Sequence, residues 1–234
     1  MRRLIALVSV FFLSACVVTP VPTGPAPGTA PSSPPPVSAT RASAAFTSVV
    51  ERVGPVAVQV CRERTRNTNC NFRIVVDDRP GLPPNAFQTL DRQGRPVIGF
   101  TVALINDARN ADELAFVLGH EAAHHIRGHI PQSQQRAVEG ALLGTVVGAL
   151  IGLEGAALET AQRAGGTINS RRFSKEFELQ ADALGTIIAA RAGYDPVRGA
   201  QFFARIPDPG DRFLGTHPPN ADRIATVKRT AAGL

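Results

Sequence analysis

The chain is poor in the residues that mark several classes of protein. Its 234 residues include only three cysteines, too few for a small fold held together by many disulfides. The 25 Lys and Arg residues are scattered rather than clustered, so nothing in the charge pattern favours nucleic acid. The sequence has no repeat of long period and no set of long hydrophobic runs, which excludes a multi-pass membrane protein. With 44% hydrophobic and 19% charged residues, it has the composition of an ordinary globular protein.

The first fifteen residues resemble the signal peptide of a bacterial lipoprotein. Two arginines precede the apolar run of residues 4–13, which is too short to span a bilayer as a stable helix. Small residues then stand directly before Cys16. The resemblance implies that residues 1–15 are removed and that Cys16 is diacylated. The mature chain, with a formal charge of about +4 instead of +6, would then sit at the periplasmic face of the outer membrane. The alternative is an ordinary signal peptide followed by an incidental cysteine.

Residues 16–40 are expected to form a lipidated tether rather than part of a folded domain. Residues 19–36 include eight prolines, among Thr, Ser, Ala, Gly and Val. Such a segment buries too little apolar surface to fold, and proline stiffens it toward an extended conformation. Residues 41–234 remain as one domain, which is long enough for a hydrophobic core.

Cys61 and Cys70 are the other two cysteines of the chain. A domain outside the reducing cytosol can keep a disulfide, and this pair would close a short, polar and basic loop. A metal-binding pair is the alternative, but no further cysteine in the domain supports it. We therefore expect a disulfide between Cys61 and Cys70.

The pattern of apolar residues predicts many helices and few strands. Helices are expected over 42–53, 174–192 and 219–231, with a short one opening at Asp195-Pro196, and strands over 72–77, 86–91 and 96–102. A long helix should run from the N-cap Asn110 to about His129, with Glu113 at the position that a capping box requires. Because the strands are grouped early and precede this helix, we expect an α+β domain that is mostly helical.

The sequence His120-Glu121-Ala122-Ala123-His124 lies inside this predicted long helix. Histidines four residues apart lie on one face of a helix, so His120 and His124 can bind the same zinc ion. Glu121 is then placed to take a proton from water on the zinc. The alternative is a helix with two surface histidines. The motif falls in a capped helix directly after a strand, which is the context that zinc chemistry requires.

A zinc hydrolase needs a third protein ligand and an open position for water. Glu178 and Asp182 lie one turn apart on the predicted helix over 174–192, so they share a face. A zinc-binding glutamate followed by an aspartate that reaches a ligand histidine forms a carboxylate–histidine–zinc arrangement. We therefore expect one Zn²⁺ per chain, with three ligands: His120, His124 and Glu178.

Three nearby residues are weaker candidates for the site. His125 lies about 100° away from His124 around the helix, and His129, on a continuous helix, would face away from the metal. We expect both histidines to be packing or supporting groups. Glu176 has Gln180 one turn further on instead of a partner, so it is expected to be a solvated charge.

These motifs resemble those of the HtpX/BepA/Oma-type family of gluzincin metallopeptidases, which also includes the CaaX prenyl proteases. Besides the helix with His120, His124 and His129, the resemblance rests on Asn85-Ala86-Phe87, Glu178 to Asp182 with Gly185, Gly193-Tyr194-Asp195-Pro196, and Thr216-His217-Pro218-Pro219 with Arg223-Ile224. It extends over about residues 45–231. Lys175 and Gln180 depart mildly from the Arg and Glu usual in the family. The resemblance implies a zincin-like domain and places His217 near the metal, as an oxyanion donor or as a plug.

The motifs and the resemblance together indicate a zinc-dependent endopeptidase. Glu121 would act as the general base and then pass its proton to the leaving nitrogen. Substrates are expected to be proteins or peptides, chiefly misfolded or unassembled envelope proteins. By resemblance to related zincins, they would pair in extended form with the strand over 97–102 as an edge strand. The first alternative is a proteolytically inert lipoprotein that acts as a chaperone or assembly factor. The second is a membrane-binding or pore-forming module built on residues 140–153, only about 21 Å long as a helix.

Gly140, Gly144, Gly148 and Gly152 recur at every fourth position. Each glycine costs about 1 kcal/mol in a helix relative to alanine, so four in one helix need a compensating reason. A stripe without side chains allows another helix to approach closely. We expect either packing against the catalytic helices of the same domain or a face for self-association or membrane contact.

Overall fold

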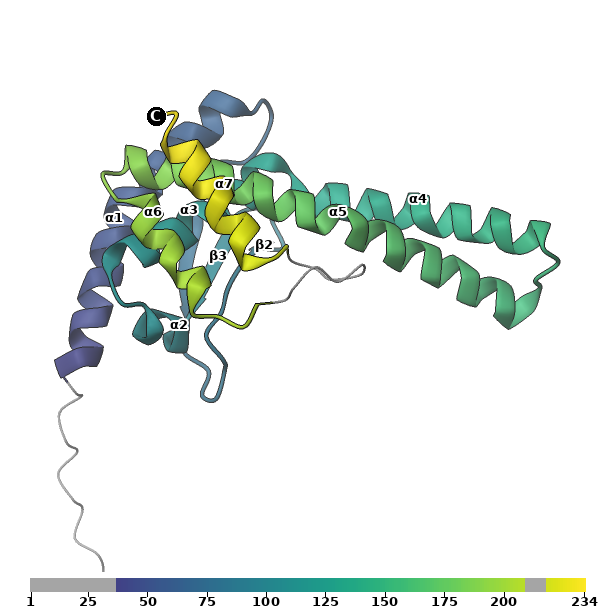
Figure 1. The fold of residues 1–234 in the computed structure, drawn as a ribbon, viewed down its shortest axis with the longest axis horizontal. Coiled ribbons are helices and arrows are strands. Elements are labelled where there is room, and N and C mark those ends of the chain that lie inside the picture. The colour runs from purple at the N-terminus through teal and green to yellow at the C-terminus, as the bar shows by residue number, and fades with distance from the viewer. Residues whose placement is uncertain (1–36, 209–217) are drawn as a thin grey trace, which may run out of the picture. The chain divides into compact units, whose positions relative to one another are not determined.

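The computed structural model describes residues 37–208 and 218–234, which all belong to one compact unit, Pro35–Leu234. In chain order the elements are α1 (Val37–Arg64), β1 (Arg73–Asp77), β2 (Ala86–Leu90), β3 (Pro96–Thr101), α2 (Val102–Asp107), α3 (Ala111–Arg127), α4 (His129–Leu150), α5 (Gly155–Arg191), α6 (Pro196–Gly199), the 3₁₀ helix η1 (Ala200–Ala204) and α7 (Asn220–Ala231). Helices predominate, and the three strands stand together before α3 (Figure 1). The expected α+β class, mostly helical with a small early sheet, is confirmed. Among the described helices, none combines the length and the hydropathy needed to cross a membrane.

Helix α1 is longer than the pattern over residues 42–53 predicted. It continues through Pro55, which lacks an N–H and normally ends or kinks a helix. Buried side chains recur at helical spacing across the proline, from Val53 to Ala57 and Val60. The burial of these residues against the core therefore outweighs the hydrogen bond lost at the proline.

The sheet has the order β1-β3-β2, with β3 in the middle. β3 runs parallel to β1 and antiparallel to β2, where Phe100 stands opposite Ala86. Since both edges of β3 are paired, our expectation that the strand over 97–102 receives substrate as an edge strand is wrong. β2 is an outer strand of the sheet, and it packs beside α3.

Helix α3 begins as the sequence predicted. The side chain of Asn110 caps it by accepting a hydrogen bond from the backbone N–H of Glu113 at 3.1 Å. The Glu113 carboxylate accepts from the backbone N–H of Arg109 and pairs with Arg205 at 2.6 Å. The first turn of α3 is thus fixed both to its own cap and to the segment that follows η1.

Helices α3 and α5 touch each other through glycine. A Cβ on Gly119 of α3 would lie only 2.8 Å from the carbonyl oxygen of Gly185 on α5. Real Cβ atoms do not approach so closely, so this contact requires a residue without a side chain. The close approach brings His120, next to Gly119, within hydrogen-bonding distance of Asp182 on α5.

The apolar stretch over 137–165 forms a helical hairpin from α4 and the first half of α5 (Figure 1). Helix α5 begins at Gly155, well before the start predicted at residue 174, and it is continuous to Arg191. The N-terminal half of α5 pairs with α4, and its C-terminal half packs against α3 and α7. One long helix therefore belongs to both the hairpin and the core.

Three of the four regularly spaced glycines lie in the contact between α4 and α5: Gly140, Gly144 and Gly148. A Cβ on Gly144 would collide with backbone atoms of Ala161, and one on Gly140 with backbone atoms of Gly165. Gly152 is not part of the stripe, because it lies in the turn after α4 with a φ of +80°. The glycine stripe is therefore covered by α5 of the same chain, not by a second molecule.

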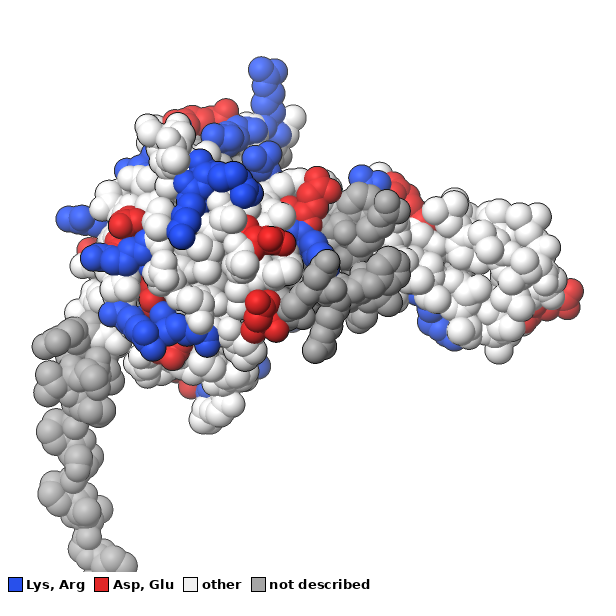
Figure 2. Space-filling view, viewed as in Figure 1, with Lys and Arg blue, Asp and Glu red and all other residues white. Residues whose placement is uncertain are grey.

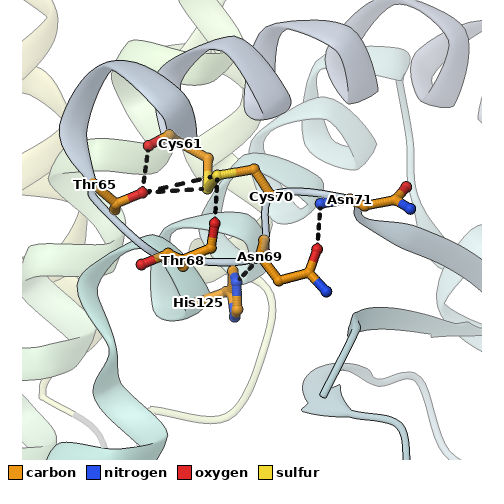
Figure 3. Close-up of a disulfide and its surroundings, with 7 residues drawn as sticks. All are labelled: Cys61, Thr65, Thr68, Asn69, Cys70, Asn71 and His125. Carbon is orange, nitrogen blue, oxygen red and sulfur yellow. Dashed lines mark hydrogen bonds between the residues drawn. A yellow bond between two sulfur atoms is a disulfide. The ribbon is translucent and has the colours of Figure 1, made fainter. Parts of the chain in front are cut away.

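A disulfide joins Cys61, at the end of α1, to Cys70, with their Cα atoms 5.8 Å apart (Figure 3). Inside the loop, the hydroxyl of Thr65 donates to the carbonyl of Cys61 at 2.7 Å. The carbonyl oxygen of Asn69 lies 2.8 Å from Nε2 of His125 on α3, so the ring N–H is the donor there. The disulfide loop thus ties the end of α1 to α3, one residue beyond His124.

Replacing Cys61 and Cys70 together by alanine should destabilise the domain. Removing a cross-link of this loop length costs about 2–3 kcal/mol in the chain-entropy model, which corresponds to a fall in Tm of roughly 5–10 °C. Differential scanning calorimetry measures the shift, and the wild type scanned with a reductant is the control. Equal Tm values for the double variant and the oxidised wild type would contradict this role for the disulfide.

Candidate active site

Three potential metal ligands converge from two helices. His120 and His124 lie one turn apart on α3, and their Nε2 atoms are 3.0 Å from each other. Glu178 on α5 places one carboxylate oxygen 3.4 Å from each of these nitrogens. The structure therefore brings together the two histidines and the downstream glutamate that the sequence indicated.

The spacing of the three donor atoms suits a small metal ion. Zinc binds imidazole and carboxylate at about 2.0–2.1 Å, and the corners of a tetrahedron of that size are roughly 3.3–3.4 Å apart. The observed separations are 3.0, 3.4 and 3.4 Å. Two neutral imidazoles with one carboxylate form a donor set that occurs in catalytic zinc sites. These residues fit a zinc ion.

Behind the ligands, Asp182 and Arg223 form a buried ion pair. Asp182 has no exposed side-chain surface, and its Oδ1 lies 2.9 Å from Nδ1 of His120. Arg223 of α7 donates to both carboxylate oxygens of Asp182, at 2.7 and 2.8 Å. Its guanidinium also lies over the Phe203 ring, 3.8 Å from the ring centroid. The same guanidinium is 3.3 Å from a carboxylate oxygen of Glu178. Asp182 thus fixes the orientation of His120, and Arg223 fixes Asp182.

Sequence reasoning gave Arg223 no role of its own beyond its place in a C-terminal motif. No local pattern marks it, because it reaches the site from a helix 41 residues after Asp182. The available signal was chemical: a buried aspartate behind a neutral ligand histidine needs a cation, and Arg is the side chain that can bind both of its oxygens.

The two ligand histidines have opposite pKa shifts. Burial disfavours the charged form of His120, but hydrogen bonds to Asp182 and Glu178 outweigh burial and raise its pKa to about 10. Burial and the charge on His120 lower the pKa of His124 to about 3. The two carboxylates therefore favour a positive charge beside them, which either a proton on His120 or a metal ion bound to its Nε2 can supply, while His124 keeps a free lone pair.

His129 lies against the site, contrary to the expectation that it faces away. That expectation assumed a continuous helix, but α3 ends at Gly128, which has a φ of +67°, and α4 begins in a new direction. Nδ1 of His129 is 2.9 Å from Nδ1 of His124. The ring stacks on Phe177 with the two centroids 4.5 Å apart. Burial lowers the pKa of His129 to about 4, so the ring is neutral and can accept a hydrogen bond.

Gln180 extends this contact to Glu176. Its Oε1 is 3.3 Å from Nε2 of His129, and its amide nitrogen donates to Glu176 at 3.0 Å. Glu176 therefore has a partner one turn on, which the sequence did not predict, but it is exposed, as expected of a solvated charge. If His124 binds a metal through Nε2, its Nδ1–H donates to His129, and the Nε2–H of His129 then donates to Gln180. One set of tautomers satisfies the whole chain.

Glu121 lines a cavity of about 280 Å³ together with the three ligands and Arg223. The lining also includes the apolar residues Phe202, Phe203 and Ile206, and Asn85 and Ala86 of the β2 region. A second cavity, of about 320 Å³, borders His124 on its other side and is lined by Gln88 and Leu90 of β2. The outer strand β2 therefore runs past the site and lines both cavities, one near its start and the other near its end.

The side-chain oxygen of Gln88 is buried without a hydrogen-bond partner among the described residues. Gln88 lies on the outer strand and lines the second cavity, so a bound chain could supply the missing donor. Two other predicted positions, Cys16 and His217, lie outside the described residues.

Comparison with known proteins places these residues in a recognised family. The model of peptidase family M48 matches residues 47–231. A Vibrio cholerae protein assigned as a beta-barrel assembly-enhancing protease is 32% identical over 138 residues, which is 53% of this chain and 28% of that protein. The Escherichia coli beta-barrel assembly-enhancing protease is 27% identical over 142 residues, 55% of this chain and 29% of that protein.

A eukaryotic relative shows the same likeness. The mitochondrial metalloendopeptidase OMA1 of Saccharomyces cerevisiae is 27% identical over 168 residues, which is 68% of this chain and 46% of that protein. The chain thus spans less than half the length of each of these three relatives.

Replacing His129 by phenylalanine should weaken zinc binding. The aromatic ring can still stack on Phe177, but it offers no acceptor to the Nδ1–H of His124. Losing a hydrogen bond behind a metal ligand typically costs tenfold to a hundredfold in affinity. Competition with a chromogenic chelator measures the dissociation constant. His125→Phe is the matched control, because His125 contacts Asn69 instead of a ligand. Equal zinc affinity in the two variants would contradict a supporting role for His129.

Proposed function

The chain belongs to peptidase family M48, and we propose that it is a zinc-dependent endopeptidase of the bacterial cell envelope. Peptidases of this family depend on zinc in general. The proposal rests chiefly on the convergence of His120, His124 and Glu178 beside Glu121 in one cavity. The relatives are much longer than this chain, so their likeness alone does not assign its activity.

His120, His124 and Glu178 would hold the zinc ion. When bound there, zinc would act as a Lewis acid and lower the pKa of water toward ~7. Glu121 follows His120 on α3 and lines the same cavity, so it accepts the proton of the attacking water. It then donates this proton to the nitrogen that leaves when the peptide bond breaks. Asp182 and Arg223 keep His120 oriented throughout these steps.

The substrate would bind as an extended chain along β2. A strand at the edge of a sheet offers unpaired backbone groups to such a chain, and β2 passes the site with a cavity on each side of His124. Backbone pairing selects for an extended conformation more than for a particular sequence. The apolar wall of Phe202, Phe203 and Ile206 would receive a hydrophobic side chain. Misfolded or unassembled envelope proteins expose segments of this kind.

We also propose that His217 lies near the metal, as the family resemblance implies. It would either donate a hydrogen bond to the oxyanion or occupy the open position and block it. A loss of activity in His217→Ala with zinc retained corresponds to the first role, and a gain to the second.

Glu121→Gln should separate metal binding from catalysis. The amide has the size of the carboxylate but cannot take a proton, so we expect retained zinc and a loss of at least a hundredfold in the rate of proteolysis. Alanine at His120, His124 or Glu178 should remove both zinc and activity. Metal analysis and digestion of a permanently unfolded protein measure the two effects, with Glu159→Gln on α5 as the carboxylate control. Full proteolysis by Glu121→Gln would contradict the mechanism, and an inactive, zinc-free wild type would favour an inert assembly factor.

We further propose that lipid on Cys16 anchors the mature chain at the periplasmic face of the outer membrane. The support is the lipoprotein-like signal and the proline-rich segment that follows it. Cys16→Ser should abolish metabolic labelling with radioactive palmitate and remove the protein from the outer-membrane fraction on fractionation. Unchanged labelling and fractionation would contradict the anchor.

A further inference from the structure

The outer side of α4 exposes large apolar side chains. Six of them form what we term the apolar face: Leu142, Leu143, Val146, Val147, Leu150 and Ile151, each about half exposed or more. Leu150, near the tip of the hairpin, is 80% exposed. Their spacing of three and four residues places them on one side of a helix. A contiguous apolar surface of this kind marks a site of interaction.

The apolar face carries no charge. Between Glu139 and Glu154 the chain has no Asp, Glu, Lys or Arg. Figure 2 shows few charged side chains on the visible surface of the outer hairpin, whereas both signs of charge are spread over the rest of the surface. This stretch has one hydroxyl, on Thr145 of α4. It donates to the carbonyl of Ala141 at 3.0 Å. The face therefore offers almost no hydrogen-bonding group to a partner.

The two sides of the hairpin differ in polarity. On one side, the groove between α4 and α5 is almost wholly apolar, and Leu143, Val147 and Ile168 line it. On the other side, α5 presents charged residues that include Glu159 and Arg163, beside Val138 of α4, which is also exposed. The hairpin as a whole is thus amphipathic, with the apolar face and the adjoining groove on one side.

Three backbone donors in the turn after α4 are paired within the hairpin. The N–H groups of Ile151, Gly152 and Leu153 donate to carbonyls of the last turn of α4. The left-handed conformation of Gly152 allows this closure. A medium without hydrogen-bonding groups imposes no penalty on donors that are already paired.

We propose that the apolar face inserts into the acyl region of one leaflet of a lipid bilayer. A protein partner is less suited to it, because protein interfaces carry about one hydrogen bond per 100–200 Å² and this face supplies almost none. The uncharged stretch of α4, residues 140–150, measures only about 17 Å, whereas the hydrocarbon core is about 30 Å thick. The hairpin therefore lies in the interface with its polar side toward water, and it does not cross the bilayer.

The proposed anchor agrees with this arrangement. The segment between Cys16 and the start of α1 at Val37 reaches at most about 70 Å when fully extended. A domain held within that distance meets the membrane surface continually, so weak insertion of one hairpin is sufficient to orient it. The hairpin then acts as a second membrane contact beside the lipid.

A single tryptophan reports insertion directly, because the chain has none of its own. The test uses the mature chain, residues 16–234, with Cys16→Ser so that no acyl group contributes. Leu150→Trp should shift its emission to shorter wavelength on addition of phosphatidylethanolamine–phosphatidylglycerol vesicles. Lipids brominated in the acyl chain should quench it. Leu234→Trp, at an exposed position outside the hairpin, is the matched control and should respond to neither.

Polar substitutions test the same face by flotation. In the unacylated chain, Leu143→Gln with Val147→Gln should lower the partition coefficient into these vesicles at least tenfold. Val76→Gln with Val102→Gln replaces two exposed apolar residues elsewhere and should leave it unchanged. Digestion of a soluble unfolded protein should be equal in both double variants, so failure of this inference is distinguishable from failure of the proposed peptidase.

Three results would overturn the inference. The first is an emission wavelength of Leu150→Trp that does not change when vesicles are added. The second is an emission shift that follows protein concentration without lipid, which would make the face an interface between two copies. The third is equal flotation of the two double variants. The tryptophan measurement decides the matter even if the glutamine variants do not fold.

Discussion

The buried carboxylate of Asp182 is the contact on which the site depends. A fully buried charge is stable only if its oxygens are bound, and here Arg223 and His120 bind them. These partners come from α7 and α3, so the ion pair holds three helices in a single arrangement. Removing one partner from such a buried pair typically costs about 3–5 kcal/mol. The geometry around His120 is therefore fixed by the same interaction that docks the C-terminal helix.

Glycine residues allow α3 and α5 to pack closely enough for this arrangement. Gly119 and Gly185 let α3 and α5 approach so closely that a Cβ at either position would collide with the facing backbone. Only at this distance can Glu178 reach both histidines while Asp182 reaches the far side of His120. The same kind of close approach recurs in the N-terminal half of α5, where Gly140 and Gly144 of α4 leave room for the α5 backbone. One continuous helix thus links the hairpin to the metal ligands, about 30 Å apart along its axis from Leu158 to Glu178.

Features encoded by short sequence patterns could be predicted, and those created by tertiary packing could not. The cap at Asn110 and the strand positions follow from local chemistry, and the structure has them. The position of His129 depends on one glycine turn after α3, which a helical projection of the sequence ignores. The central place of β3 depends on pairing with a distant strand. Arg223 joins the site only after the whole chain has folded, because its partner is a buried aspartate on another helix.

The most direct test of the account is the position of the metal in crystals of the zinc-loaded protein. Anomalous scattering measured on both sides of the zinc absorption edge locates the ion independently of any assumption about its ligands. The account predicts one peak per chain, about 2.0–2.2 Å from Nε2 of His120, Nε2 of His124 and a carboxylate oxygen of Glu178. A peak at another position, or an ion bound without Glu178, would contradict it.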